Sequence, residues 1–238
     1  MEKGKFFLLM VLLLSVVACR GNEMNENYTT VLSEKIDLYE SLKWLSDKKI
    51  YFGHKSVGEN IIDGIKEILD QYTQIDIRIL ETTLDSDFGS PVFAHSSVGR
   101  NNDPISKIDA FSGYLKKGIN EKVDIAFFKL CYVDFNTLTN IEDVFRRYRN
   151  TMTELKNEYP EITFLHLTVP LVTHETGIKT AIKKIVGRPL WGYDDNLVRE
   201  RYNEMIRREY SGREPLFDIA QVESTHSDGK REFYHKDN

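Results

Sequence analysis

The chain has 238 residues, of which 41% are hydrophobic and 29% are charged, and its formal net charge is −5 at pH 7. Lys and Arg are dispersed among acidic residues instead of being gathered in one stripe, so the sequence argues against a nucleic-acid partner. The length suits one large α/β domain better than two small ones.

The first 18 residues have the layout of a secretory signal peptide. Lys3 and Lys5 precede an unbroken apolar run from Phe6 to Leu14, and small residues follow as far as Ala18. This run is too short for a bilayer span, which takes about 20 apolar residues. We therefore expect residues 1–18 to be removed during export.

The segment Val16-Val17-Ala18-Cys19 resembles the lipobox of bacterial lipoproteins. The resemblance implies that the Cys19 thiol carries a diacylglyceryl group and becomes the first residue of the mature protein. Each buried methylene contributes only ~0.8 kcal/mol, so a stable anchor needs two or three acyl chains. The expected location is the bacterial cell envelope, either in the periplasm or at the cell surface, with the membrane as partner through this lipid.

The alternative is an ordinary secreted protein with a chance cysteine at position 19. If Cys19 is acylated, Cys131 is the only remaining thiol, and no intramolecular disulfide is expected despite the oxidising compartment. The core must then stabilise the fold.

Residues 20–34 are polar and are interpreted as a tether between the lipid and a domain that spans residues 35–238. In this domain, Lys49–Phe52 is predicted to be a short strand. A helix is predicted over Val57–Tyr72, because apolar residues recur there at helical spacing. They are Ile61, Ile62, Ile65, Ile68 and Leu69.

The middle of the chain continues this alternation. Ile75–Leu80 has the period-two pattern of a strand, and a long loop is predicted over Glu81–Asn102. A helix over Pro104–Leu115 follows, with Pro104 in its first turn. Val123–Leu130 is nearly all apolar, which is typical of a central strand buried on both faces.

In the last third, Thr139-Asn140-Ile141-Glu142 has the pattern of a capping box and predicts the start of a helix that Pro160 ends. Ile162–Val169 is predicted to be a strand, Asn196–Tyr210 a helix and Leu216–Val222 the final strand. The segment from residue 170 to residue 195 receives no assignment.

Together these elements predict an α/β fold in three layers, an α/β/α sandwich around a mostly parallel sheet of about five strands. In such sheets the chemistry lies at the carboxyl ends of the strands. The side chains that follow each predicted strand are therefore the first candidates for a functional site.

The first strand leads into Gly53-His54-Lys55-Ser56-Val57-Gly58-Glu59-Asn60, which places Ser56 in the turn before a helix. Amides of the first helical turn can stabilise the negative charge of a tetrahedral intermediate there. Three other motifs are rejected. Glu59-Asn60 stands where a P-loop has Lys-Ser/Thr, Gly53 is one residue too far from Ser56 for the α/β-hydrolase elbow, and the dinucleotide fingerprint is absent.

What remains resembles the SGNH (GDSL-like) hydrolase superfamily, in a variant with Gly-His-x-Ser-Val-Gly in place of Gly-Asp-Ser. The resemblance covers roughly residues 48 to 225 and rests on the strand order and three segments: Gly53–Gly58, Phe93–Asn101 and Lys129–Asp134. It implies a flavodoxin-like fold, an esterase-type reaction with Ser56 as nucleophile, and an oxyanion hole that includes the Gly99 amide. A plain helix N-cap is the alternative role for Ser56.

The third block of the superfamily, Gly-x-Asn-Asp, is matched poorly by Cys131-Tyr132-Val133-Asp134. Asn101 and Asn136 are the candidates to replace its side-chain donor in the oxyanion hole. An ionised Asp134 would repel an oxyanion, so we interpret it as an orienting residue or a helix cap.

A serine nucleophile needs a base and a group that orients the base. The superfamily supplies both from Asp-x-x-His after the last strand, whereas this chain has Glu223-Ser224-Thr225-His226 and Glu232-Phe233-Tyr234-His235. His226 with Glu223 is the candidate pair within the chain. The alternative is that the sequence stops before its catalytic histidine, because similar members continue into a Gly-His segment and a final helix.

Other histidines have competing interpretations. His54 either joins the site or packs beside Ser56, His95 is interpreted as a loop residue with a site role as the alternative, and His166 is predicted to be a core histidine. Trp191 and Tyr193 either line a substrate groove or anchor a loop. No cofactor and no metal site are predicted, because no two His or Cys stand at ligand spacing on one element.

Two functions follow. The first is a membrane-tethered serine hydrolase that cleaves esters, including acyl groups on carbohydrate or cell-envelope glycans. The second is a catalytically incomplete surface lipoprotein that binds a glycan or an acyl ligand in the same cleft.

Overall fold

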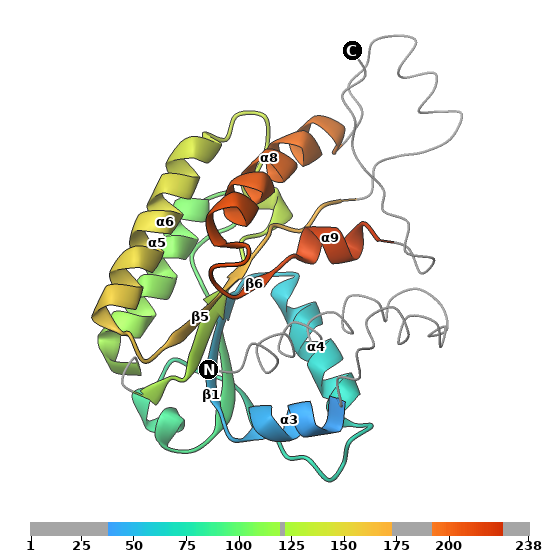
Figure 1. Ribbon diagram of the computed structural model, residues 1–238, viewed down its shortest axis with the longest axis vertical. Helices are drawn as coiled ribbons and strands as arrows, with labels where there is room; N and C mark the ends of the chain where they lie inside the picture. Colours follow the sequence, from blue (N-terminus) through green and yellow to red (C-terminus); the bar gives the residue numbers. More distant parts are fainter. Residues whose placement is uncertain (1–37, 120–121, 173–191, 226–238) are drawn as a thin grey trace.

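A computed structural model describes residues 38–119, 122–172 and 192–225 of the protein (Figure 1). The expectations for the signal peptide, for Cys19 and for the tether concern residues outside this part of the chain. Within the described part, no helix has both the length and the apolar character required to cross a membrane.

The centre of the fold is a six-stranded sheet with the strand order β2-β3-β1-β4-β5-β6, in which every neighbouring pair is parallel. The prediction of a parallel α/β sheet is confirmed, and the sheet has one strand more than expected. The strands are β1 (Lys49–His54), β2 (Ile79–Glu81), β3 (Val92–Ser97), β4 (Ile125–Phe128), β5 (Thr163–Leu167) and β6 (Leu216–Phe217).

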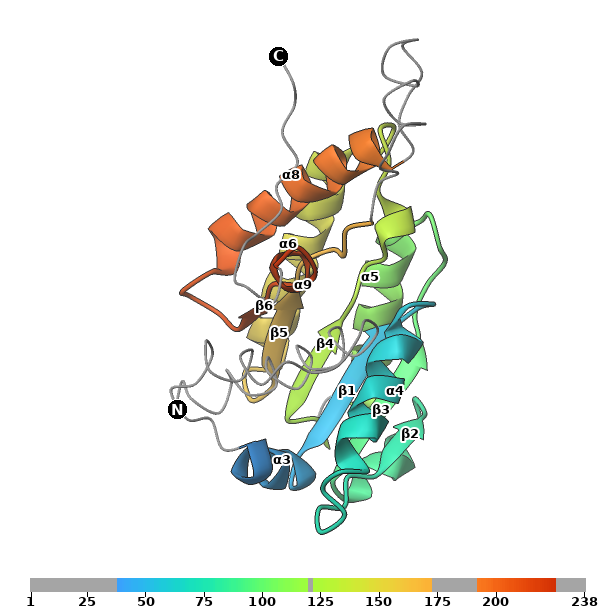
Figure 2. The same cartoon turned by 90° about the vertical axis from the view of Figure 1, so that its right-hand side faces the viewer.

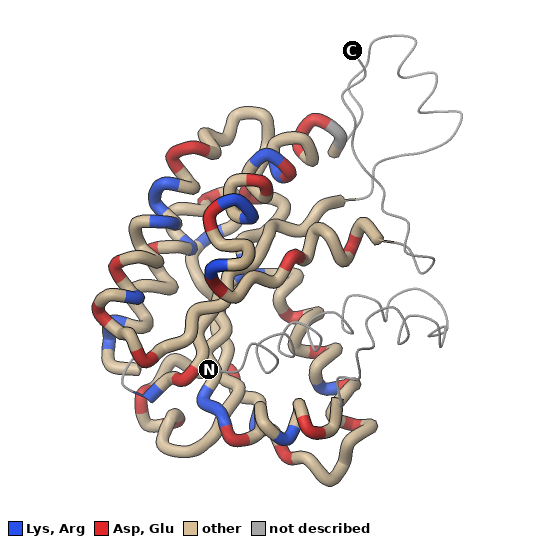
Figure 3. The backbone as a smooth tube through the Cα atoms, viewed as in Figure 1, with Lys and Arg blue, Asp and Glu red and all other residues tan. Residues whose placement is uncertain are grey.

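Helices cover both faces of the sheet. On one face lie α3 (Leu38–Ser46), α4 (Gly58–Leu69) and α9 (Ile219–Glu223); on the other lie α5 (Pro104–Tyr114), α6 (Ile141–Glu158) and α8 (Tyr193–Tyr210). In Figure 2 the strands lie side by side and α4 crosses in front of them. Lys and Arg are interspersed with Asp and Glu along the helices (Figure 3).

The alternation of side chains in the strands divides the core in two. In β1, Ile50 and Phe52 pack with α4, whereas Tyr51 packs with α5 on the opposite face. In β4, Phe127 packs on the α4 side of the sheet and Phe128 on the α5 side. Both faces of the central strands are therefore apolar, which agrees with the continuous hydrophobic runs in the sequence.

The prediction of one long loop over Glu81–Asn102 was wrong, because this range contains β3. The strand was missed because its second half is polar, although His95 and Ser96 are buried. The Ser96 hydroxyl lies 2.8 Å from the Tyr51 hydroxyl, and His95 contacts a histidine of β1, so neighbouring strands satisfy these groups.

The predicted strand over Leu216–Val222 was wrong in its second half, where α9 begins after only two strand residues. The chain turns from strand to helix at Asp218, which is the N-cap of α9: its carboxylate accepts from the Gln221 amide at 3.0 Å. Arg207 donates to the same carboxylate at 2.6 Å and fixes it.

Of two predicted helix starts, one is confirmed and the other has its N-cap one residue later than predicted. Pro104 lies in the first turn of α5 as predicted, behind the N-cap Asp103. The N-cap of α6 is Asn140, which accepts from the Asp143 amide at 3.2 Å, and not Thr139 as predicted. Thr139 instead accepts from the Asn136 amide and closes the preceding turn. The sequence had suggested no element for the range of α3.

Candidate active site

Ser56 lies in the turn between β1 and α4, at the carboxyl edge of the sheet, and it is exposed. Its backbone has φ = 48°, in the left-handed region that residues other than glycine rarely adopt. Such a conformation costs about 1–3 kcal/mol and is concentrated at functional sites. The N-cap of α4 is Val57, without side-chain capping, so the Ser56 hydroxyl does not serve as a helix cap.

The Ser56 hydroxyl instead accepts a hydrogen bond from Nδ2 of Asn101 at 3.2 Å. The Asn101 amide is held in this orientation because its Oδ1 accepts from Nζ of Lys107, also at 3.2 Å. Asn136, the other candidate donor, has its Oδ1 engaged by the Leu138 amide. Of the two asparagines, the structure brings Asn101 to the serine.

Lys107 is fixed by an ion pair with Asp134, with 2.6 Å between Nζ and Oδ2, and both side chains are 0% exposed. The Asp134 carboxylate also accepts from the amides of Asn102 at 3.0 Å and Cys131 at 2.7 Å. All of its lone pairs therefore face donors, as a buried carboxylate requires. The pair joins α5 to the loop after β4, and both of its members hold the loop after β3, which carries Asn101.

Gly99 follows β3 with φ = 55°, and a Cβ atom there would lie 2.5 Å from the backbone nitrogen of Lys107. Only glycine fits this conformation and this approach. The Val98 amide donates to the His54 carbonyl at 2.8 Å, which keeps the loop of Gly99 beside the turn of Ser56. Among the described residues, the amides of Gly99 and Ser56 have no hydrogen-bond partner, so both can serve a ligand.

Lys129, Cys131 and Glu223 lie along the same edge of the sheet. The buried ammonium group of Lys129 lies 3.8 Å from Sγ of Cys131, and burial lowers its pKa. The Cys131 thiol donates to the Lys55 carbonyl at 3.3 Å. This strand end is therefore connected to the turn that carries Ser56.

Glu223 accepts from the Leu171 amide at 3.2 Å. Although the residue is exposed, the protein around its carboxyl desolvates it and raises its pKa to about 7, against an attraction to Lys129. His226, its predicted partner, and Trp191 lie outside the described residues. The same holds for the side chain of Tyr193.

His54 is buried under the first turn of α4, where Gly58 makes room for it: a Cβ atom at position 58 would lie 2.3 Å from Cβ of His54. The motif Gly-His-x-Ser-Val-Gly thus has a packing reason for its second glycine. Burial, with nearby His95 and Lys129, lowers the pKa of His54 to about 4. The ring faces the interior beneath the serine turn.

His95 was interpreted as a loop residue, which is wrong because it lies in β3, with Nδ1 3.0 Å from Nε2 of His54. Glu59 completes a cluster with these two histidines. This cluster could not be predicted, since its members come from three separate elements. His166 is a core histidine as predicted, bonded to Tyr148 at 2.8 Å and to Glu214 at 3.0 Å.

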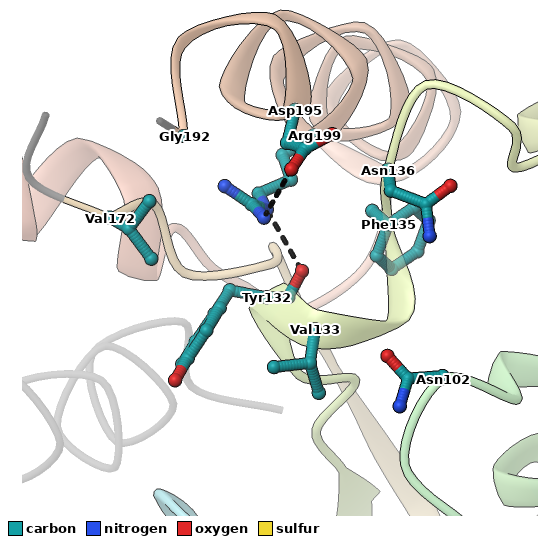
Figure 4. A pocket seen from close by; sticks show the side chains of 9 residues that line it. All are labelled: Asn102, Tyr132, Val133, Phe135, Asn136, Val172, Gly192, Asp195 and Arg199. Carbon is teal, nitrogen blue, oxygen red and sulfur yellow. Dashed lines mark hydrogen bonds and ion pairs between the residues drawn. The ribbon is translucent and has the colours of Figure 1, made fainter. Parts of the chain in front are cut away.

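A pocket of about 240 Å³ opens beside Asn102, between the loop after β4 and the start of α8 (Figure 4). Its wall combines an aromatic ring with polar groups. Arg199 lies over the Tyr132 ring at 5.6 Å and donates to the Tyr132 carbonyl at 2.9 Å. The remaining lining residues are Val133, Phe135, Asn136, Val172, Gly192 and Asp195.

No model of a known protein family matches the chain, and no curated protein matches it. The geometry of the site is therefore the basis for assigning a function.

Proposed function

We propose that the protein is a serine hydrolase of the SGNH type, which cleaves esters through an acyl-enzyme on Ser56. One observation carries the proposal: Nδ2 of Asn101 lies 3.2 Å from Oγ of Ser56 and is aimed there by the buried pair of Lys107 and Asp134. The sheet supports it as well. Without the short edge strand β2, the order β3-β1-β4-β5-β6 follows the flavodoxin-like pattern.

Three donors are available for the oxyanion of a tetrahedral intermediate: the amides of Ser56 and Gly99 and the side chain of Asn101. The Ser56 oxygen attacks the carbonyl carbon, its proton passes to a base, and the alcohol leaves with a proton. Water then hydrolyses the acyl-enzyme. Donors fixed in advance stabilise the negative oxygen without reorganising. In this proposal Asn101, from the second block, replaces the asparagine of the third.

The base is proposed to be His226, with Glu223 three residues before it as the orienting carboxylate. One oxygen of Glu223 is fixed by the Leu171 amide, which leaves the other for a histidine. Unchanged ester hydrolysis by His226→Ala would exclude His226 as the base.

The pocket beside Asn102 supports an acylated carbohydrate as substrate. Tyr132 offers a flat apolar surface, while Asn136 and Asp195 offer hydrogen bonds, a combination that suits a sugar ring with its hydroxyl groups. The acyl ester would lie at Ser56 and the sugar in the pocket.

Attachment to the cell envelope through Cys19 belongs to the same proposal, and it is supported by the lipobox-like segment. Growth of an expressing bacterium with labelled palmitate should label the unaltered chain and not the Cys19→Ser variant. Equal labelling of both would contradict the anchor and leave the hydrolase proposal untouched.

The hydrolase proposal is tested by hydrolysis of a short acyl ester and an acetylated oligosaccharide. We expect Ser56→Ala to lower kcat by about 10⁴-fold or more, as for loss of other serine nucleophiles. Ser97→Ala is the matched control, because Ser97 is an exposed serine of the same edge that contacts Lys55. Equal rates for Ser56→Ala and the unaltered chain would contradict the proposal.

A binding lipoprotein without catalysis is the second candidate. It is favoured by one observation: within the described residues, the partner of the Ser56 hydroxyl is an asparagine and not a histidine. It expects oligosaccharide binding without hydrolysis, and equal binding by the Ser56→Ala variant.

A further inference from the structure

Three side chains that can bind a metal ion meet on the α4 side of the sheet. His54 comes from the end of β1, His95 from β3, and Glu59 from the first turn of α4. One ligand atom of each lies within 4.8 Å of the other two. The proposed hydrolysis uses none of these three side chains. We propose that His54, His95 and Glu59 form a binding site for a divalent ion of the zinc class.

The two histidines already have nearly the separation that such an ion requires. Nε2 of His54 and Nδ1 of His95 face each other at 3.0 Å. Two imidazole nitrogens bound to tetrahedral zinc at about 2.0–2.1 Å are roughly 3.4 Å apart. A small outward movement of the rings would therefore admit the ion between them.

The remaining nitrogen of His54 is the second observation. His54 is 1% exposed, and among the residues that the structure describes its Nδ1 has no hydrogen-bond partner. This nitrogen lies 3.8 Å from Oε1 of Glu59. Buried polar atoms are rarely left unsatisfied. An ion between the rings would replace the hydrogen bond that now joins Nε2 of His54 to Nδ1 of His95. It would place the His54 proton on Nδ1, toward the Glu59 carboxylate, as metal-binding histidines commonly do.

Both histidines of the cluster are in the protonation state that binds a cation. Burial lowers the pKa of His54 and of His95, so both rings are neutral at pH 7, which is the form that binds metals. The surrounding charges are mixed: Lys129 and Lys55 oppose positive charge at His54. Glu59 and Glu81 favour positive charge at His95, and Lys66 opposes it.

Access and coordination number are also suitable. Glu59 is 56% exposed, so it marks the side from which an ion can enter. The two histidines would bind the ion, Glu59 would orient His54 through Nδ1, and water would fill the remaining positions. The ion would fasten the start of α4 to β1 and β3, and so brace the turn that carries Ser56.

The experiment is titration of the purified full chain with Zn²⁺ by calorimetry and with Co²⁺ by visible absorption. We expect one ion per chain and the absorption bands of Co²⁺ with low coordination number. Glu59→Gln should weaken binding by about 10-fold or more. Its control is Asp63→Asn, which removes another exposed carboxylate of α4, one that pairs with Lys66 at 3.9 Å. This variant should bind the ion as the unaltered chain does.

His95→Ala should lose the site, and the double variant His226→Ala/His235→Ala should keep it, because those histidines lie at the end of the chain. Absence of binding by the unaltered chain would overturn the proposal. Full affinity in Glu59→Gln would do the same, and this exposed substitution decides the question even if His95→Ala fails to fold.

Discussion

Two buried polar clusters lie beneath the turn of Ser56, one on each face of the sheet, and they are built differently. On the α5 side, Lys107 and Asp134 are oppositely charged, and their hydrogen bonds are complete. On the α4 side, His54 and His95 share one hydrogen bond, and Nδ1 of His54 has no partner within the described part of the chain.

The difference shows what each cluster can do. A complete network has one low-energy arrangement and therefore orients Asn101 toward the serine. The incomplete cluster has a polar atom that the described residues do not satisfy, and it is where we propose that the ion binds. The predictions below separate these two roles.

The largest effect is expected from breaking the complete cluster. Lys107→Met leaves the Asp134 carboxylate buried without a counter-ion, which should lower the free energy of unfolding by about 3–5 kcal/mol. Urea unfolding measures this loss. Adding Asp134→Asn should restore part of the stability, because a neutral amide needs no counter-ion.

The control for this pair is Lys116→Met. Lys116 is exposed and pairs with Glu158 at 3.5 Å and with Glu154 at 3.9 Å. Exposed ion pairs contribute little, so its loss should change stability by no more than about 0.5 kcal/mol. Similar losses of unfolding free energy in Lys107→Met and Lys116→Met would mean that the buried ion pair stabilises the fold no more than an exposed one.

The next effect concerns catalysis and not stability. Asn101→Asp retains the size of the side chain but removes the Nδ2 donor, and kcat for ester hydrolysis should fall by about 10²–10³-fold. Asn101 is exposed, so the free energy of unfolding should stay within about 0.5 kcal/mol. An unchanged kcat would show that Asn101 is no part of the oxyanion hole.

The incomplete cluster should appear in the pH dependence of stability. The pKa of His54 is lowered from 6.5 to about 4 in the folded protein. Between pH 4 and pH 6.5 the unfolded chain therefore binds more protons than the folded chain. Above pH 6.5 His54 contributes about 3 kcal/mol to the free energy of unfolding, and this contribution is lost as the pH falls to about 4.

Metal-free protein is used for this measurement, and urea unfolding at several pH values gives the slope. In His54→Gln the slope between pH 4 and pH 6.5 should be shallower, whatever the absolute stability of the variant. Parallel slopes for the two proteins would exclude His54 as the titrating group.

The two clusters also show how far a sequence can be interpreted. Ser56 and Gly99 stand in motifs whose spacing indicates a turn after a strand, so both could be predicted. Lys107 could not, because a lysine in a helix is usually exposed, and only the tertiary fold reveals that its amine meets Asp134.

The fold has the same limit. Strands with continuous apolar runs, such as β4, were found, whereas β3 was missed because His95 and Ser96 look like loop residues until their partners on β1 are known. The grouping of His54, His95 and Glu59 depends on strand order and on the position of α4. Neither can be inferred from local periodicity.

The central claim is that Ser56 is an activated nucleophile. Treating the full chain with a fluorophosphonate and locating the adduct by mass spectrometry tests it most directly. We expect one adduct, on the Ser56 hydroxyl, which is absent from Ser56→Ala and present in Ser97→Ala. An unlabelled Ser56 in the folded, unaltered chain would contradict the claim.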